Sequence, residues 1–219
     1  DHDSMRPTAA VRKEETLETE LALKRLTHSD PAIRADAARS LGGTDDPRVL
    51  SGLRRALDDE DAEVRFWAAR GVEDGGQREE AERLLPLLHD PHSRVRQGAA
   101  LALGFLGRRE AVPPLIDVLE GGENDLRFQA VLSLQRLEPL CQGQHRALLV
   151  ERLVRLLSEG DGELVAVVAS ALSLFDPDRA REELPPLLED DDGDVRFQAA
   201  LGLLPGEEAV AEVARALRD

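Results

Sequence analysis

The sequence contains no tyrosine, and aromatic residues make up only 3% of its 219 residues. Its apolar surface therefore comes mainly from alanine and leucine, which favours helices over sheets. Cys141 is the single cysteine, so no intrachain disulfide can form, which fits a reducing compartment. No apolar run approaches the roughly 20 residues needed to cross a bilayer. These absences together predict a helical protein of the cytoplasm with no membrane partner.

Basic residues are fewer than acidic ones, so the formal net charge is -16. Such a chain repels phosphate backbones, so we expect no nucleic-acid partner. The imbalance is uneven: residues 1–110 carry a net charge of −4 and residues 111–219 carry −12. This asymmetry would steer a basic partner towards the C-terminal half, although an acidic surface that maintains solubility explains it equally well.

An internal repeat is the main feature of the sequence. An aliphatic residue precedes an arginine at four evenly spaced positions, Arg34, Arg65, Arg96 and Arg127. The larger gap from Arg127 to Arg196 fits two further units. The first of the two has Val165 in place of arginine and follows a seven-residue insertion near residues 138–145. Six units therefore share one register, and a constant period of this kind is the signature of a repeat architecture.

Each unit carries two helical patterns. Three, four and seven residues after the arginine position, small and aliphatic residues such as Ala37, Ala38 and Leu41 form one stripe of a helix. The other pattern is rich in leucine and has proline in its first turn, as in residues 111–119. One such unit cannot bury its stripe alone, so neighbouring units must stack.

Residues 30–42 and 95–104 resemble HEAT repeats of the short bacterial type that is also found in phycobilisome lyases. The resemblance implies an all-α fold, a right-handed α-α superhelix of about six helix pairs plus a C-terminal capping helix. It also implies that the arginine-bearing second helices line the concave side. We expect a single domain over residues 5–219, with residues 1–4 as a cloning remnant. The predicted units lie near residues 11–42, 46–73, 78–106, 110–137, 145–175 and 178–204, with the cap at 207–218.

The repeated arginines lie inside the apolar stripe, so their guanidinium groups need partners. Aspartates stand just upstream in most units, at Asp30, Asp61, Asp90, Asp125, Asp161 and Asp194. We expect a structural ladder of Arg–Asp pairs between consecutive repeats, interrupted at Val165. The arginines of this ladder are Arg34, Arg65, Arg96, Arg127 and Arg196. A row of arginines that binds a ligand is the alternative.

Positions one, two and five residues after the arginine fall opposite the stripe and hold an unusual share of aromatic and aliphatic residues. An apolar row on a face that should be hydrated is typical of an interaction site. The alternative is that the rings cover adjacent repeats. The predicted partner-binding residues are Arg39, Phe66, Trp67, Arg70, Leu101, Phe128, Leu132, Val167, Phe197 and Leu201.

Metal-binding and catalytic patterns are weak. Cys141 and His145 supply only two ligands, His89 and His92 fall in a turn, and residues 190–194 lack the ligand spacing of a calcium loop. There is no phosphate-binding loop and no nucleophile elbow, and no histidine is followed by the glutamate used in metal-dependent HEAT-repeat hydroxylases. We expect no metal, no cofactor and no catalytic residue.

The sequence therefore predicts a non-catalytic scaffold or adaptor that binds a protein or peptide on the concave face. The alternative is an enzyme or enzyme subunit resembling bilin lyases, in which an apolar groove with arginine would bind a tetrapyrrole. Trp67 beside Arg70 is compatible with that role, whereas the lack of tyrosine and of an acid–base pair argues against it. A DNA-binding HEAT-like protein ranks last, because that class needs a broadly basic groove.

Overall fold

The computed structural model describes residues 9–43, 46–72 and 78–203, and all regular structure in these ranges is helical. The α-helices are α1 (Ala9–Arg25), α2 (Pro31–Ser40), α3 (Pro47–Ala56), α4 (Ala62–Gly71), α5 (Arg78–Leu84), α6 (Ser93–Leu106), α7 (Val112–Gly121), α8 (Asn124–Arg136), α9 (Gln144–Glu159), α10 (Gly162–Phe175), α11 (Pro177–Glu183) and α12 (Gly193–Leu203). Short 3-10 segments adjoin them at η2 (Leu85–His89), η3 (Arg109–Ala111), η4 (Glu138–Leu140) and η5 (Pro185–Glu189). The predicted cap and residues 1–4 lie outside the described residues. Among the helices described, none is both long and apolar enough to traverse a lipid bilayer.

The chain divides into two compact units, residues 1–102 and residues 103–219, with the boundary inside α6. We call them the N-terminal unit and the C-terminal unit. In a repeat protein each pair contacts only its neighbours, so packing is local along the chain.

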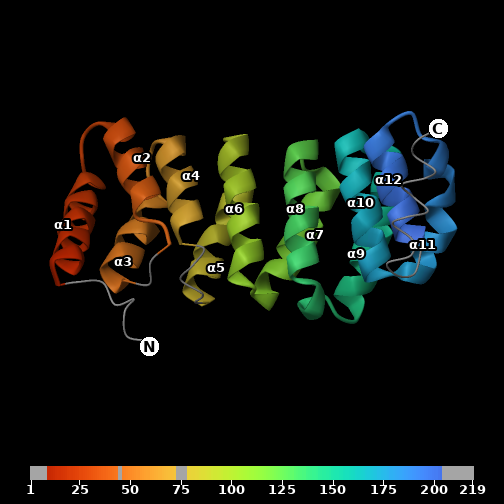
Figure 1. The fold of residues 1–219 in the computed structure, drawn as a ribbon, viewed down its shortest axis with the longest axis horizontal. Coiled ribbons are helices and arrows are strands. Elements are labelled where there is room, and N and C mark those ends of the chain that lie inside the picture. The colour runs from red at the N-terminus through yellow and green to blue at the C-terminus, as the bar shows by residue number, and fades with distance from the viewer. Residues whose placement is uncertain (1–8, 44–45, 73–77, 204–219) are drawn as a thin grey trace. The chain divides into compact units, whose positions relative to one another are not determined.

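Within each unit the helices alternate between two layers (Figure 1). In the N-terminal unit α2 packs against α4, and α1 contacts α3. In the C-terminal unit α10 packs against both α8 and α12, and α7 contacts α9. The even-numbered helices carry the arginine pattern, and we call the side they form the second-helix face. The expected succession of all-α helix pairs is confirmed in the described residues.

Aspartate caps explain where α2, α4 and α10 begin. The side chain of Asp30 accepts a hydrogen bond from the backbone N–H of Ala32 at 2.9 Å, and Pro31 occupies the first turn of α2. Asp161 accepts from the N–H of Leu164 at 3.1 Å at the start of α10. Such caps satisfy N–H groups that have no partner within the helix, and proline in the first turn costs nothing because its missing N–H is not needed there.

The alanine stripe is the contact surface between neighbouring second helices. Ala37 and Ala38 on α2 are at most 2% exposed, and Ala68 and Ala69 on α4 are fully buried. Small side chains let the helix axes approach closely, while larger leucines such as Leu53 fill the space between the layers. The same arrangement recurs in the C-terminal unit. Its fully buried stripe residues include Ala130, Val131, Val168 and Ala169.

Gly104 on α6 lies against the backbone of α8. A Cβ atom placed on Gly104 would lie 2.7 Å from the Cβ and 2.9 Å from the Cα of Ser133. Ser133 is fully buried, so neither residue can move aside into solvent. Glycine is therefore required at this position by the distance between the two helices rather than by backbone dihedrals.

The inserted residues before the fifth unit are part of the packed structure. They form η4, and Cys141 immediately after it is fully buried. Arg146 on α9 donates from Nη1 to Glu138 at 2.7 Å and from Nε to the carbonyl oxygen of Phe175 at 2.8 Å. These bonds tie the insertion to the end of α10.

Substituting Gly104→Ala should destabilise the fold by about 1–3 kcal/mol, because the added methyl group meets the α8 backbone. The matched control is Gly121→Ala, where the new Cβ would have nothing within 4 Å and the alanine gains helix propensity. Urea unfolding followed by circular dichroism measures both. Equal stability of the two variants would contradict the close approach of α6 and α8.

Candidate functional site

The arginine near the start of each second helix is bound to the turn that precedes the helix. Nη1 of Arg34 donates to the carbonyl oxygens of His28 at 2.9 Å and Ser29 at 3.1 Å. The same pair of bonds, to residues six and five positions upstream, recurs at Arg65, Arg96 and Arg196. These guanidinium groups thus satisfy carbonyls of the interhelical turn, which have no helical partner.

Two of these arginines also form ion pairs with the following repeat. Nε and Nη2 of Arg34 donate to the two carboxylate oxygens of Asp59, both at 2.8 Å. Arg65 pairs in the same way with Asp90, at 2.7 and 2.9 Å. All four side chains are nearly buried, at 5–13% exposed. The paired, parallel bonds match the planar fork of guanidinium to carboxylate.

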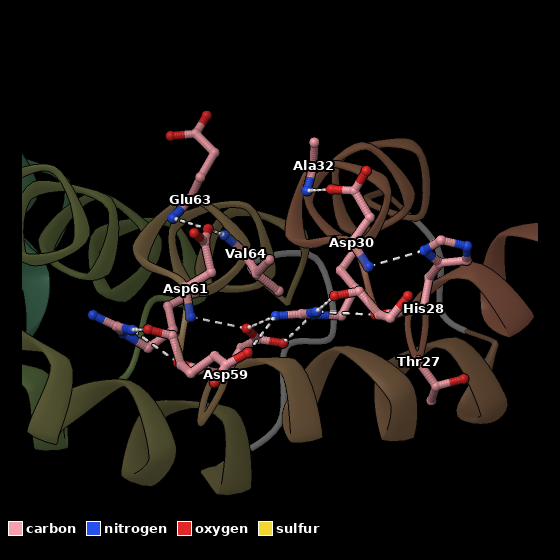
Figure 2. Close-up of polar contacts among 12 residues, drawn as sticks. Thr27, His28, Asp30, Ala32, Asp59, Asp61, Glu63 and Val64 are labelled. Atoms are coloured by element: carbon pink, nitrogen blue, oxygen red, sulfur yellow. Dashed lines mark hydrogen bonds and ion pairs between the residues drawn. The ribbon is translucent and has the colours of Figure 1, made fainter.

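Asp90, which pairs with Arg65, is one of the upstream aspartates predicted from the sequence, whereas Asp59, which pairs with Arg34, is not. Asp30 and Asp61, which the sequence offered as partners, instead cap α2 and α4, and Figure 2 shows Asp61 accepting from the N–H groups of Glu63 and Val64. Asp59 stands two residues before its cap, and its carboxylate reaches back to the preceding repeat. Asp90 holds the position of Asp59 in the next unit.

The fifth unit replaces the ion pair with apolar packing. Val165 and Ala166 on α10 are buried together with Val195 on α12, and Leu157 and Leu187 pack beside them. In the fourth unit Nη2 of Arg127 donates to the carbonyl oxygen of Glu120 at 3.1 Å. Apolar packing therefore joins α10 to α12 at the position where an Arg–Asp ion pair joins the repeat of α2 to that of α4.

The ion pairs lower the pKa of their carboxyl groups. Burial is the largest single influence on Asp59 and Asp90 and raises the pKa of each. The arginine hydrogen bonds, a backbone N–H bond to each carboxylate and the charge of the arginines together outweigh burial and hold each carboxyl pKa below its ordinary value. A carboxyl whose pKa is lowered by folding stabilises the protein above its unfolded-state pKa. That stabilisation is lost as the pH falls through the folded-state pKa, so these pairs weaken in acid.

Substituting Asp90→Asn should lower the free energy of unfolding by about 3 kcal/mol at pH 7, because it leaves the buried charge of Arg65 without its counterion. The difference from the unsubstituted chain should shrink below about pH 4, where aspartate is increasingly protonated in the unfolded chain. Urea unfolding at pH 7 and pH 3 measures this. The control Asp36→Asn removes an exposed pair with Arg39 and should cost less than about 1 kcal/mol. A similar loss in the free energy of unfolding of both variants would contradict the claim that burial makes the Arg65–Asp90 pair more stabilising than an exposed pair.

An aromatic cluster lies on the second-helix face of the N-terminal unit. The rings of Phe66 and Trp67 meet edge to face with centroids 4.9 Å apart. The guanidinium of Arg94 lies 4.3 Å from the Phe66 ring centroid, and that of Arg39 lies 5.7 Å from the Trp67 centroid. Glu63 accepts from Trp67 Nε1 at 2.8 Å and from Arg94 Nη1 at 2.6 Å. Charged groups of the chain itself therefore already contact both rings and accept the hydrogen bond of the indole N–H.

Phe66 also fills the space over α6. A Cβ atom placed on Gly98 would lie 2.8 Å from the Phe66 ring, so the ring rests directly on the glycine backbone. Both aromatic side chains are half-buried rather than exposed. In this unit the rings cover the neighbouring repeat, which is the alternative that the sequence left open.

A groove runs along the second-helix face of the C-terminal unit, between α8, α10 and α12. Its volume is about 520 Å³. Phe128 and Leu132 of α8 and Val167 of α10, all predicted as partner-binding residues, form its apolar lining together with Ala166. Phe128, Leu132 and Val167 are half-buried, so each keeps part of its apolar surface open to a partner.

Polar residues complete the groove, and none of them was among the predicted partner-binding residues. The polar lining consists of Gln135, Glu163, Ser170, Asp194 and Gln198. Gln135 Nε2 donates to Ser170 Oγ at 3.4 Å, which joins α8 to α10. Glu163 and Asp194 stand two residues before the arginine position of their units, in the first turns of α10 and α12. Their shared position in the repeat register is the signal that could have identified them.

The remaining predicted partner-binding residues are not among those that line this groove. Leu201 lines a separate hollow of about 410 Å³ together with Leu174 and Arg181. Four others also do not line the groove: the exposed Arg39 and the half-buried Arg70, Leu101 and Phe197. The predicted row is thus divided between the aromatic cluster, the groove and scattered positions.

Potential metal ligands are dispersed in the structure. Within residues 9–43, 46–72 and 78–203, no three His, Cys, Asp or Glu side chains are grouped so that they could hold a metal ion. Burial raises the pKa of the Cys141 thiol to about 11, so the thiol is protonated at neutral pH.

Comparison with protein families explains the repeated unit. A model described as HEAT repeats matches residues 19–86 and 75–135, which together span more than half of the chain. The chain belongs to the HEAT-repeat family. This confirms the resemblance drawn from residues 30–42 and 95–104. No functionally curated protein matches the HEAT-repeat chain at a significant level.

Solved structures share the fold of this HEAT-repeat chain. YibA of E. coli is 20% identical, with a TM-score of 0.70 over 100% of this chain and 89% of YibA. The CpcE–CpcF complex of phycocyanin lyase from Nostoc sp. PCC7120 is 19% identical, with a TM-score of 0.63 over 100% of this chain and 97% of that one. A designed armadillo repeat protein in complex with the peptide (KR)4 is 18% identical, with a TM-score of 0.57 over 88% and 99%. These similarities confirm the HEAT- or armadillo-type solenoid class.

Proposed function

We propose that this HEAT-repeat chain is a non-catalytic adaptor that binds a peptide segment of a partner protein in the groove of the C-terminal unit. The observation that carries the proposal is the lining of that groove, where Phe128, Leu132 and Val167 sit among polar side chains. Aromatic residues such as Phe128 are enriched at protein interfaces, and apolar neighbours such as Leu132 and Val167 exclude water around an anchor of this kind.

The polar lining suits a peptide backbone. Gln135, Gln198 and Ser170 can each donate and accept hydrogen bonds, which an extended peptide needs because its own N–H and C=O groups are unpaired. A volume of about 520 Å³ holds a few side chains rather than a folded domain. The groove therefore fits a short linear segment.

The alternatives drawn from the sequence suit this groove less well. Tetrapyrrole propionates and DNA phosphates are anions, whereas the charged residues among the described lining are Glu163 and Asp194. Two carboxylates repel such ligands. Solenoids of this class supply a precedent for the adaptor, since CpcE is found in a complex with CpcF and the designed armadillo protein binds (KR)4.

Selection from a random peptide library on the immobilised chain tests the proposal, with affinities then measured by fluorescence anisotropy. The double variant Phe128→Ala/Leu132→Ala should bind the selected peptides at least about tenfold more weakly, because it removes two anchors of the groove. Circular dichroism establishes that the variant is folded.

The matched control is Leu188→Ala, which removes an apolar side chain that is 42% exposed on η5 and does not line the groove. It should leave the affinities unchanged. If no peptide is selected, or if the groove variant and the control bind equally well, the groove is not the binding site.

A further inference from the structure

The groove of the C-terminal unit has a charge as well as a shape, and its charge identifies the chemistry of its occupant. Resting on the proposed peptide-binding function, we infer that the bound segment is basic, with lysine or arginine side chains that pair with Glu163 and Asp194. Apolar side chains between the basic ones contact Phe128, Leu132 and Val167.

The two carboxylates are available for a partner. Glu163 and Asp194 are both exposed, and in the described part of the chain neither carboxylate has a hydrogen bond or an ion pair. Neighbouring acidic residues are differently used: Asp161 accepts from Asn124 Nδ2 at 2.9 Å and caps α10. Glu163 and Asp194 thus line the groove with negative charge that the fold itself does not use.

Among the described residues of the C-terminal unit, three arginines of α8 and α12 are engaged elsewhere. Arg196 Nη1 donates to the carbonyl oxygens of Asp190 at 2.7 Å and Asp191 at 3.0 Å. Arg127 donates to the carbonyl oxygen of Glu120, and the guanidinium of Arg136 lies 4.6 Å from the Phe105 ring centroid. Residues 111–219 carry a net charge of −12, so the field around the groove attracts a cationic segment.

Repeat geometry sets the spacing of the basic residues. Glu163 and Asp194 occupy equivalent positions of consecutive units, on two helices that pack against each other. Packed helices lie about 8–10 Å apart, and an extended polyproline-type segment advances about 3.1 Å per residue with three residues per turn. Basic side chains at positions i and i+3 of such a segment point the same way and match the two carboxylates.

Three synthetic peptides test the inference by fluorescence anisotropy against the full chain. Each is a nonapeptide of three Pro-Leu-X triplets, with lysine, glutamine or glutamate at X. The lysine peptide should bind at least about tenfold more tightly than the glutamate peptide at low salt, and its affinity should fall as salt rises. The double variant Glu163→Gln/Asp194→Asn should lose about tenfold in affinity for the lysine peptide and almost none for the glutamine peptide.

A charge-matched control separates local pairing from the general field. Glu151→Gln/Glu189→Gln removes the same net charge from exposed positions on α9 and η5, outside the groove, and should retain the affinity for the lysine peptide. An equal loss in the control, or equal binding of the three peptides to the unsubstituted chain, would overturn the inference. If the three peptides bind the unsubstituted chain equally well but bind Phe128→Ala/Leu132→Ala more weakly, the proposed function stands without the charge preference. If none of the three binds, the inference fails, and the library selection decides the proposed function separately.

Discussion

Close packing of alanine-lined second helices is the constraint on which the rest of this structure depends. A single helix pair would leave its stripe in water, so each pair must be covered by the next. The small residues that allow this contact, such as Ala68, Ala69 and Gly104, leave no room for side chains between the helices. Larger and polar groups are consequently displaced to the turns and to the second-helix face, where the charged pairs and the groove are found.

The charged pairs at the turns follow from this arrangement. Stacking buries the side chains of Arg34 and Arg65 beside turns whose carbonyls have no helical partner. Arg34 and Arg65 satisfy those carbonyls, and Asp59 and Asp90 from the next repeat neutralise the two guanidinium groups. Since Val165 and Val195 achieve the corresponding contact without charge, the ion pairs represent one of two ways to join repeats.

Much of the fold could be predicted from the sequence because its signals are local and repeated. The spacing of Arg34, Arg65 and Arg96 gives the unit, and the alanines that follow each arginine give the buried stripe. The pairing of Asp59 rather than Asp61 could not be predicted in the same way. Both carboxylates precede α4 by a few residues, and only the cap geometry shows that Asp61 is committed to backbone N–H groups.

The candidate site was predictable only in part, since the pattern that finds exposed apolar positions does not say how each is used. Phe66 and Phe128 hold the same position in their units, yet Phe66 rests on Gly98 while Phe128 lines an open groove. The difference arises from the residue on the neighbouring helix, a contact between distant parts of the sequence. Glu163 was missed because exposed acids are common, and Asp194 was expected in the Arg–Asp ladder, although its carboxylate has no ion pair in the described residues. Only their position beside the groove distinguishes the two.

The central claim is that a partner segment occupies the groove between α8, α10 and α12. Methyl-resolved NMR during titration with a peptide selected by this HEAT-repeat chain tests it most directly. We expect the methyl signals of Leu132 and Val167 to shift progressively to saturation, while those of the buried residues Leu50 and Leu53 stay in place. Saturable binding that leaves Leu132 and Val167 unmoved would contradict it.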